Sequence, residues 1–397
     1  MKRRVIELEE YKPLRLDEGE LDRTDADALW RLYGGSRIGI EYPTPKTDDQ
    51  WELTSLGWVG YIPLTSGFHL NLQSKVPLDN IFGMLEYAYN LKSFEVLEGV
   101  HDCRSLDQVF EKLAHVLAKR VLDRARQGFY REYLHRNERL SYLRGRMEIR
   151  SLASRPWDIQ LQCRYEEHTP DIDDNQILAW TLYRISRSSA CGERSLNTIR
   201  RAYRSLSGLV LLRPHPSASC LGRLYHRLNE DYRPLHALCR FFLENAGPTH
   251  QVGDQETIPF LLNMNSLFEL FVARWLQAHP PEGLKVNVQH SIPLNDDGSL
   301  RFTVDIVLVD ERSGEPVCVI DTKYKAPEGP ATDDVQQVIA YAETLGCREA
   351  VLLYPIELKQ PYHGRPQRSD IRVRTLAFPL EGDFEEAGRE LLAHLRS

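Results

Sequence analysis

The sequence has no apolar run long enough to span a bilayer, and its basic first residues are not followed by an apolar stretch. We therefore expect a cytoplasmic protein with no membrane partner. No G-x-x-x-x-G-K-[ST] phosphate loop occurs, so the chain itself is not expected to bind or hydrolyse a nucleotide. No G-x-S-x-G or other nucleophile motif accompanies a His and Asp set, which argues against serine-hydrolase chemistry.

Cysteine is scarce and scattered. Seven cysteines occur along the chain, and no two of them form a C-x-x-C pair. An odd number at wide spacing argues against a disulfide framework or a zinc site, and predicts free thiols in a reducing compartment. The histidines at 168, 215, 226 and 236 show no metal-ligand spacing, so we interpret them as surface or core residues.

The charge is unevenly distributed. The whole chain of 397 residues carries a net charge of -7, yet residues 101–240 hold 25 Lys+Arg against 16 Asp+Glu. Nearly all of these basic residues are arginines, whose planar guanidinium suits phosphate recognition. The middle of the chain is therefore a candidate DNA-facing region, although the same charges are also compatible with ordinary solvated helix faces.

Five arginines of this basic region are candidate DNA contacts: Arg124, Arg126, Arg131, Arg144 and Arg146. Tyrosines 130, 133 and 142 lie between them in the sequence. Basic residues interleaved with aromatic ones can grip a phosphate backbone, because the rings stack on bases while the cations pair with phosphates.

The hydrophobic patterns predict an α+β, multi-domain chain. Residues 1–30 are polar and give little periodic signal, whereas short alternating strands between residues 37 and 73 predict a small β-barrel-like or antiparallel domain over 1–80. Amphipathic patterns predict a helical, arginine-rich region over 81–250. The remaining residues, 251–397, are predicted to form a third domain with a mixed sheet. The N-terminal domain is expected to contact a partner or nucleic acid.

Residues 301–325 give the strongest functional signal. An alternating, β-branched segment over 302–309 and an apolar run over 317–320 flank a polar connector that contains Gly314, which predicts a β-hairpin. Side chains alternate along a strand, so Asp321 and Lys323 point to one face. Asp305 of the first strand can lie opposite Asp321. Two carboxylates and an ammonium are thus predicted at one end of the hairpin.

Buried charges of this kind need a partner or a metal, because each unpaired ion costs several kcal/mol. Mg²⁺ binds one or two carboxylates together with waters and phosphate oxygens, and Mn²⁺ is a possible substitute. The spacing D-x15-D-x-K resembles the PD-(D/E)xK nuclease signature, in which Asp305 and Asp321 hold the metal and Lys323 is catalytic. The Thr322 carbonyl is a possible further ligand. A structural ion pair between Asp321 and Lys323 is the alternative.

The flanking segments fit the same interpretation. A predicted helix before the sheet carries Glu269 outside its main apolar stripe, where the carboxylate can reach the metal site or remain a surface acid. A predicted helix after D-x-K places Gln337 and Tyr341 on one face, with Thr332 or Asp333 as its cap. A Gln-x-x-x-Tyr pair resembles the RecB-like branch of these nucleases. The element order matches an αβββαβ core.

Taken end to end, the chain resembles the McrC family, the nuclease subunit of the McrBC modification-dependent restriction system. The matching motifs lie throughout the chain: W-V-G-Y-I at 58–62, G-M-L-E-Y-A-Y at 83–89, L-R-G-R-M at 143–147, E-E-H-T at 166–169, D-N-Q-I-L at 174–178 and N-S-L-F-E at 265–269. The resemblance implies a DNA endonuclease that works with an AAA+ GTPase ring, McrB, and stimulates its GTP hydrolysis. A stand-alone nuclease and a non-catalytic adaptor of a partner NTPase remain the alternatives.

Overall fold

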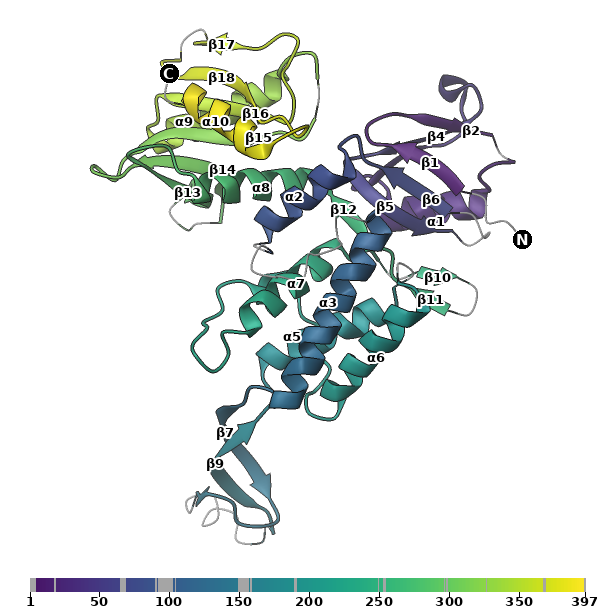
Figure 1. Ribbon diagram of the computed structural model, residues 1–397, viewed down its shortest axis with the longest axis vertical. Coiled ribbons are helices and arrows are strands. Elements are labelled where there is room, and N and C mark those ends of the chain that lie inside the picture. The colour runs from purple at the N-terminus through teal and green to yellow at the C-terminus, as the bar shows by residue number, and fades with distance from the viewer. Residues whose placement is uncertain are drawn as a thin grey trace. The chain divides into compact units, whose positions relative to one another are not determined.

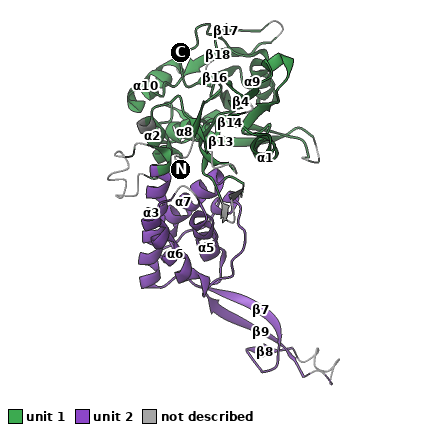
Figure 2. Ribbon diagram, turned by 90° about the vertical axis from the view of Figure 1, so that its right-hand side faces the viewer, with its two compact units in different colours: residues 1–107, 247–397 green, residues 108–246 purple. Residues whose placement is uncertain are grey.

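The computed structural model describes residues 5–395 apart from 18, 65–68, 90, 92–102, 104, 149–156, 158, 189–190, 249, 253–254, 296, 298, 326 and 367–368. The chain folds into two compact units, one of residues 1–107 with 247–397 and one of residues 108–246 (Figure 2). Both contain helices and β-sheets. The predicted α+β, multi-domain class is confirmed at this level.

The units divide the chain differently from the predicted boundaries at 80 and 250. Helix α2 (Leu78–Ala88), which the sequence places in the helical region, belongs to the first unit. It packs against α8 (Met264–Ala278), and the ring centroids of Tyr87 on α2 and Phe271 on α8 are 5.8 Å apart. Apolar contacts to a helix far along the sequence therefore decide where α2 belongs.

The N-terminal part of the first unit contains two sheets around one apolar core. The first, called here the N-terminal sheet, has the order β1-β6-β5-β12, and the second has the order β2-β4-β3. Their strands are β1 (Val5–Glu9), β2 (Leu14–Leu16), β3 (Ile38–Glu41), β4 (Trp51–Ser55), β5 (Trp58–Pro63), β6 (His69–Gln73) and β12 (Leu261–Asn263). Both sheets contribute residues to the same core as α1 (Arg23–Tyr33).

The first thirty residues are more regular than the sequence suggests. Strand β1 runs parallel to β6 and buries Ile6 and Leu8 while Glu7 and Glu9 remain exposed. The alternation is confined to one short strand, so it is easily missed in a polar segment. Strand β1 is stabilised by its pairing with β6, which lies much later in the sequence.

The C-terminal part of the first unit contains a six-stranded mixed sheet with the order β13-β14-β15-β16-β18-β17, called here the C-terminal sheet. Its strands are β13 (Leu284–Pro293), β14 (Arg301–Asp310), β15 (Pro316–Thr322), β16 (Glu349–Tyr354), β17 (His363–Gly364) and β18 (Arg372–Ala377). Helix α9 (Thr332–Leu345) shares a core with one face of the sheet, and α10 (Phe384–Leu395) follows β18.

The predicted hairpin is present as the antiparallel pair β14 and β15. The predicted cap of α9 is wrong, because the N-cap residue is Ala331, which makes no side-chain cap bond. Asp333 and Asp334 lie instead in the first turn, where acidic side chains are favourable near the positive end of the helix dipole.

The second unit is a helical body that carries a β-arm (Figure 1). The body contains α3 (Leu106–Gln127), α5 (Asp173–Ser186), α6 (Glu193–Ser207), the short 3₁₀ helix η3 (Ser217–Cys220) and α7 (Tyr232–Asn245). The arm is the three-stranded sheet of β7 (Glu132–Leu140), β8 (Arg146–Met147) and β9 (Leu161–Thr169), in the order β7-β9-β8. The predicted helical region thus also contains strands. In the described residues, no helix is both long and apolar enough to cross a membrane.

Candidate functional site

The two aspartates and the lysine of the D-x15-D-x-K pattern come together at the end of the β14–β15 hairpin. Ile306 pairs with Ile320, so the next position along each strand places Asp305 opposite Asp321. Thr322 donates to Asp305 Oδ2 through both its backbone N and its Oγ1, each at 2.8 Å. Lys323 Nζ lies 2.8 Å from Asp321 Oδ2. We call Asp305, Asp321 and Lys323 the acid–lysine cluster.

The strand that carries D-x-K is held on both sides. Strand β15 pairs with β14 on one edge and runs parallel to β16 on the other, where Asp321 is opposite Leu352. The Lys323 backbone N continues this pairing by donating to Leu353 O at 2.8 Å. Because β15 is central in the sheet, the polar residues at its end are fixed by a buried apolar strand.

Burial dominates the electrostatics of the cluster. Burial and the neighbouring charge of Asp305 raise the pKa of Asp321 to about 6, although Lys323 opposes the shift. Burial also raises the pKa of Asp305, while the bonds from Thr322 oppose it. Burial alone would lower the pKa of Lys323, yet the charge of Asp321 and other acids raises it overall, so the ammonium is protonated at neutral pH.

Glu269 lies beside these two aspartates, as the sequence allowed. Burial and then the charges of Asp305 and Asp321 raise the pKa of Glu269 to about 7. The side-chain amide of Gln289 donates to Glu269 Oε1 and opposes that shift. Residues on α8, β13, β14 and β15 therefore contribute to one acidic site.

Gln289 is a site residue that sequence reasoning did not identify. It lies in β13 between Val288, which pairs with Ile306, and His290, which pairs with Val304. The register therefore places Gln289 across from Asp305. Its backbone φ is +49°, in the left-handed region that a residue with a side chain rarely adopts. Such strain concentrates at functional sites, and the spacing of Gln289 in the sequence gives no hint of it.

The predicted supporting pair on α9 also reaches the cluster. Lys323 Nζ donates to Gln337 Oε1 at 3.1 Å, and Gln337 Nε2 donates to the Tyr341 hydroxyl at 2.6 Å. A further acid, Asp334, lies 3.8 Å from Lys323 and 2.5 Å from Lys325. The i, i+4 spacing of Gln337 and Tyr341 on one helix face explains why this part was predictable.

The donor set of the cluster fits a hard divalent cation. Two carboxylates and the backbone carbonyl of Thr322 are oxygen donors, and Mg²⁺ completes its shell with waters and phosphate oxygens. Within the described ranges, no three His, Cys, Asp or Glu side chains already form a ready-made metal site. Asp305 and Asp321 are the two carboxylates that would hold the ion, with waters and substrate oxygens completing its shell.

The five candidate DNA-binding arginines all lie in the second unit. Two of them form ion pairs with residues far along the sequence: Arg124 pairs with Asp231 at 3.3 Å, and Arg144 pairs with Glu167 at 3.1 Å. Arg126 is exposed and pairs with its neighbour Asp123. Arg131 and Arg146 are exposed on or beside the arm. The assignment of these arginines to DNA binding stays a prediction.

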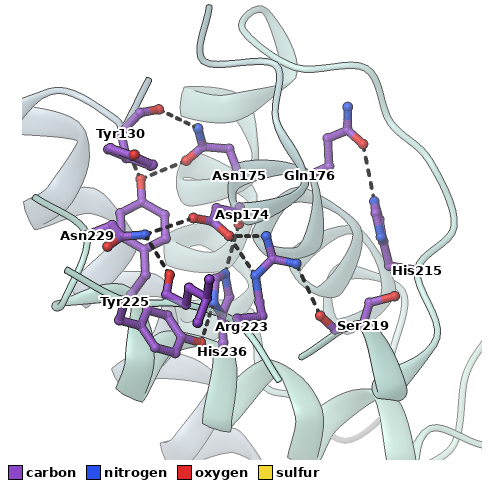
Figure 3. A network of polar contacts seen from close by, with 12 residues as sticks. Tyr130, Asp174, Asn175, Gln176, His215, Ser219, Arg223, Tyr225, Asn229 and His236 are labelled. Carbon is purple, nitrogen blue, oxygen red and sulfur yellow. Dashed lines mark hydrogen bonds and ion pairs between the residues drawn. The ribbon is translucent and has the colours of Figure 1, made fainter. Parts of the chain in front are cut away.

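A separate polar network occupies the helical body. Figure 3 shows Arg223, Asn229 and His236 gathered around the buried Asp174. Arg223 Nε donates to Asp174 Oδ1 at 2.6 Å, and Asn229 Nδ2 lies 3.3 Å from Asp174 Oδ2. The Tyr225 hydroxyl is 2.9 Å from His236 Nδ1, and His236 Nε2 is 3.0 Å from the Asp174 backbone carbonyl oxygen. Burial lowers the pKa of His236 to about 4.

The residue after Asp174 connects this network to the arm. Asn175 Nδ2 donates to the Tyr130 carbonyl at 2.9 Å and to the Pro170 carbonyl at 2.7 Å. Those two carbonyls lie just before β7 and just after β9. One buried amide therefore ties together the two ends of the arm, which gives this network a structural role.

Residues 53–355 match the family described as "McrBC 5-methylcytosine restriction system component". A relative from Escherichia coli K12, the "Type IV methyl-directed restriction enzyme EcoKMcrBC", is 23% identical over 268 residues, which cover 64% of this chain and 74% of that protein. A structure from Thermococcus gammatolerans of McrB AAA+ hexamers with bound McrC matches at a TM-score of 0.54 and 16% identity, covering 99% of each chain. That likeness shows a shared fold. Because the family match spans most of the sequence, the chain belongs to the McrBC 5-methylcytosine restriction system family.

Proposed function

We propose that this chain is the Mg²⁺-dependent DNA endonuclease subunit of a McrBC-like restriction complex. The observation that carries the proposal is the convergence of the buried Asp321 with the half-buried Asp305 and Lys323, with the lysine ammonium 2.8 Å from Asp321. A mere surface ion pair would not gather three carboxyl groups with raised pKa values beside one lysine. Perturbed carboxyl groups of this kind are typical of catalytic sites.

The order of elements supports a PD-(D/E)xK nuclease fold for the C-terminal part. Helix α8 is followed by the antiparallel strands β13, β14 and β15, then by α9 and the parallel strand β16. This is the αβββαβ order of that fold. The two N-terminal sheets, which share one core, support a small barrel-like domain in front of it.

Asp305, Asp321 and the Thr322 carbonyl are the groups that would hold Mg²⁺, or Mn²⁺ in its place. When bound, the ion lowers the pKa of a bound water and offsets negative charge on the phosphate. Thr322 holds Asp305 in place through its two hydrogen bonds. Lys323, protonated because nearby acids raise its pKa, orients the attacking water and stabilises the negative charge that develops on the phosphate oxygens.

The partners in this proposal are DNA and a McrB-like AAA+ GTPase ring in the cytoplasm. The fold match is to an assembly in which McrC is bound to McrB hexamers, which supports a ring partner for this chain. Modified-base recognition is assigned to that partner, which also supplies the nucleotide hydrolysis. The exposed Arg126, Arg131 and Arg146 are the predicted arginines best placed to meet phosphates.

The test is plasmid cleavage by the complex of this chain with its McrB-like partner, in the presence of GTP and Mg²⁺. Lys323→Ala and Asp321→Ala should abolish cutting, while both proteins still assemble with the partner and stimulate its GTP hydrolysis. Lys359→Ala is the matched control, because it removes the same charge from an exposed lysine that pairs with the exposed Glu328. It should cut normally.

Three other outcomes have distinct meanings. Unchanged cutting by Lys323→Ala would remove the acid–lysine cluster from the reaction. Cutting by the purified chain with Mg²⁺ alone would identify a stand-alone nuclease. Stimulation of the partner by a wild-type chain that never cuts would identify a non-catalytic adaptor.

A further inference from the structure

A buried acid at the end of β1 contacts the residue that follows the lysine of the acid–lysine cluster. Glu10 is fully buried, and its Oε2 accepts hydrogen bonds from the Tyr324 hydroxyl at 3.1 Å and from the Lys75 backbone N at 3.2 Å. Tyr324 is itself buried and directly follows Lys323. A side chain of the N-terminal sheet region therefore reaches the D-x-K segment from the other end of the chain.

The Glu10 contact is costly, which argues against an incidental role. Glu10 Oε1 is buried and has no hydrogen-bond partner among the described residues. A buried carboxyl with an unsatisfied oxygen destabilises the folded state unless something offsets it. The next residue, Tyr11, has a backbone φ of +56°, so the chain is also strained at this point.

A second connection runs from the same sheet to the helix that carries Glu269. Strand β12 pairs with β5 of the N-terminal sheet, and α8 begins at the very next residue. The Tyr11 hydroxyl donates to Asn265 Oδ1 at 3.0 Å, in the first turn of α8. Met264 N donates to Gly57 O at 2.9 Å. Gly57 has a φ of +79°, which a residue with a side chain rarely adopts, and a Cβ there would collide with the side-chain ends of Tyr11 and Asn265.

The two connections meet inside the protein. Phe268, which precedes Glu269 on α8, packs against Tyr324 with ring centroids 6.1 Å apart. Glu10 thus accepts a hydrogen bond from the Tyr324 hydroxyl while Phe268 packs against the Tyr324 ring. A displacement of the N-terminal sheet would be passed to both Lys323 and Glu269, because buried side chains in contact cannot move independently.

We propose that Glu10 and Tyr324 are positioning residues that fix Lys323 in the acid–lysine cluster and couple DNA cleavage to the state of the N-terminal sheet. This inference rests on the proposed nuclease function. Its consequence is regulatory: a partner that binds the N-terminal sheet acts on the cleavage site through the Glu10–Tyr324 hydrogen bond. Neither residue touches the reacting phosphate in this proposal.

The experiment compares Tyr324→Phe, which removes only the hydroxyl, with wild type in the assembled complex. We expect kcat for plasmid cutting to fall about tenfold, the size of one lost hydrogen bond at a catalytic site, with KM for DNA unchanged. Glu10→Leu should give the same loss, whereas Glu10→Gln, which keeps an acceptor oxygen, should restore most of the activity. The double variant Glu10→Leu with Tyr324→Phe should be no worse than either single variant.

Tyr42→Phe is the matched control, because it removes a tyrosine hydroxyl that donates to Asp27 in the N-terminal part, away from the C-terminal sheet. It should cut at the wild-type rate. Hydrogen exchange provides a readout that does not depend on cleavage. The peptide that contains the Lys323 amide, bonded to Leu353 O, should exchange faster in Glu10→Leu than in wild type.

Unchanged exchange of that peptide, wild-type cutting by Tyr324→Phe, or single losses that multiply in the double variant would each overturn the proposal. Lys323→Ala is measured alongside to separate the two ideas. If Lys323→Ala is inactive while Tyr324→Phe is fully active, the nuclease function holds and only the coupling fails. If wild type and Lys323→Ala cut alike, the nuclease function itself fails.

Discussion

Substitution of Gln289 tests whether backbone strain beside the acid–lysine cluster is retained because the Gln289 side-chain amide is needed there. Gln289 has a φ of +49° and donates to Glu269 from its side chain. Gln289→Ala and Gln289→Gly both remove the amide, but only glycine adopts this backbone conformation without cost. A non-glycine residue in the left-handed region loses about 1–2 kcal/mol. The glycine variant should therefore be more stable than the alanine variant by about 1–2 kcal/mol.

That difference corresponds to a gap of about 1–3 °C in the thermal unfolding temperature of a protein this size, whose entropy of unfolding is about 2.1 cal/mol/K per residue. Gly346 offers the reverse control, because it has a φ of +71° and a Cβ added there would meet no other atom within 4 Å. Gly346→Ala should lower the unfolding temperature by a similar amount. Equal unfolding temperatures for Gln289→Ala and Gln289→Gly would refute the strain argument.

Both Gln289 variants should cut DNA at the same reduced rate. Both lack the side-chain amide, and we expect the rate to depend on that amide and not on the backbone conformation. The Gln289 bond lowers the pKa of Glu269, which burial raises to about 7. Its removal raises that pKa further, so a carboxylate that must be ionised needs a higher pH. The acid limb of the cleavage pH profile should move to higher pH in both variants. An acid limb at the wild-type pH in both variants would show that ionisation of Glu269 is not required for cleavage.

Two further predictions concern the helical body. Burial lowers the pKa of His236 from 6.5 in the unfolded chain to about 4 in the folded protein. Between pH 4 and pH 6.5 only the unfolded chain binds a proton at His236, so the free energy of unfolding rises with pH. Urea unfolding should show the second unit to be about 2 kcal/mol less stable at pH 5 than at pH 7 on this account, and a flat dependence would contradict it. Asn175→Ala should cost about 1–3 kcal/mol and speed hydrogen exchange in the arm, because two buried carbonyls lose their donor. Unchanged arm exchange would show that Asn175 does not hold the arm.

The hairpin could be predicted because its information is local. Strand period and turn residues fix which side chains share a face, and the D-x-K spacing then places Asp321 and Lys323 together. The same holds for Gln337 and Tyr341, which are one helical turn apart. Local periodicity was therefore sufficient for the order of elements from α8 to β16.

The arm and the long-range contacts could not be predicted in this way. Strand β7 has no buried residue, and β9 buries only Cys163 and Thr169, so neither has the apolar face that marks a strand in sequence. Gln289 and Glu10 reach the site through tertiary contacts between segments that are far apart in the sequence. Their chemistry depends on register and burial, which no motif encodes.

The raised pKa values at the cluster have one physical cause that also explains its contacts. Burial raises the pKa of all three carboxyl groups, those of Glu269, Asp305 and Asp321, and the charges of neighbouring aspartates add to the rise for Glu269 and Asp321. The protein offsets this rise only in part, through Gln289, the Thr322 bonds and Lys323. A single ammonium cannot neutralise three carboxylates. In the proposed function a divalent cation would supply the missing positive charge, which is why we propose a metal-dependent reaction here instead of a structural ion pair.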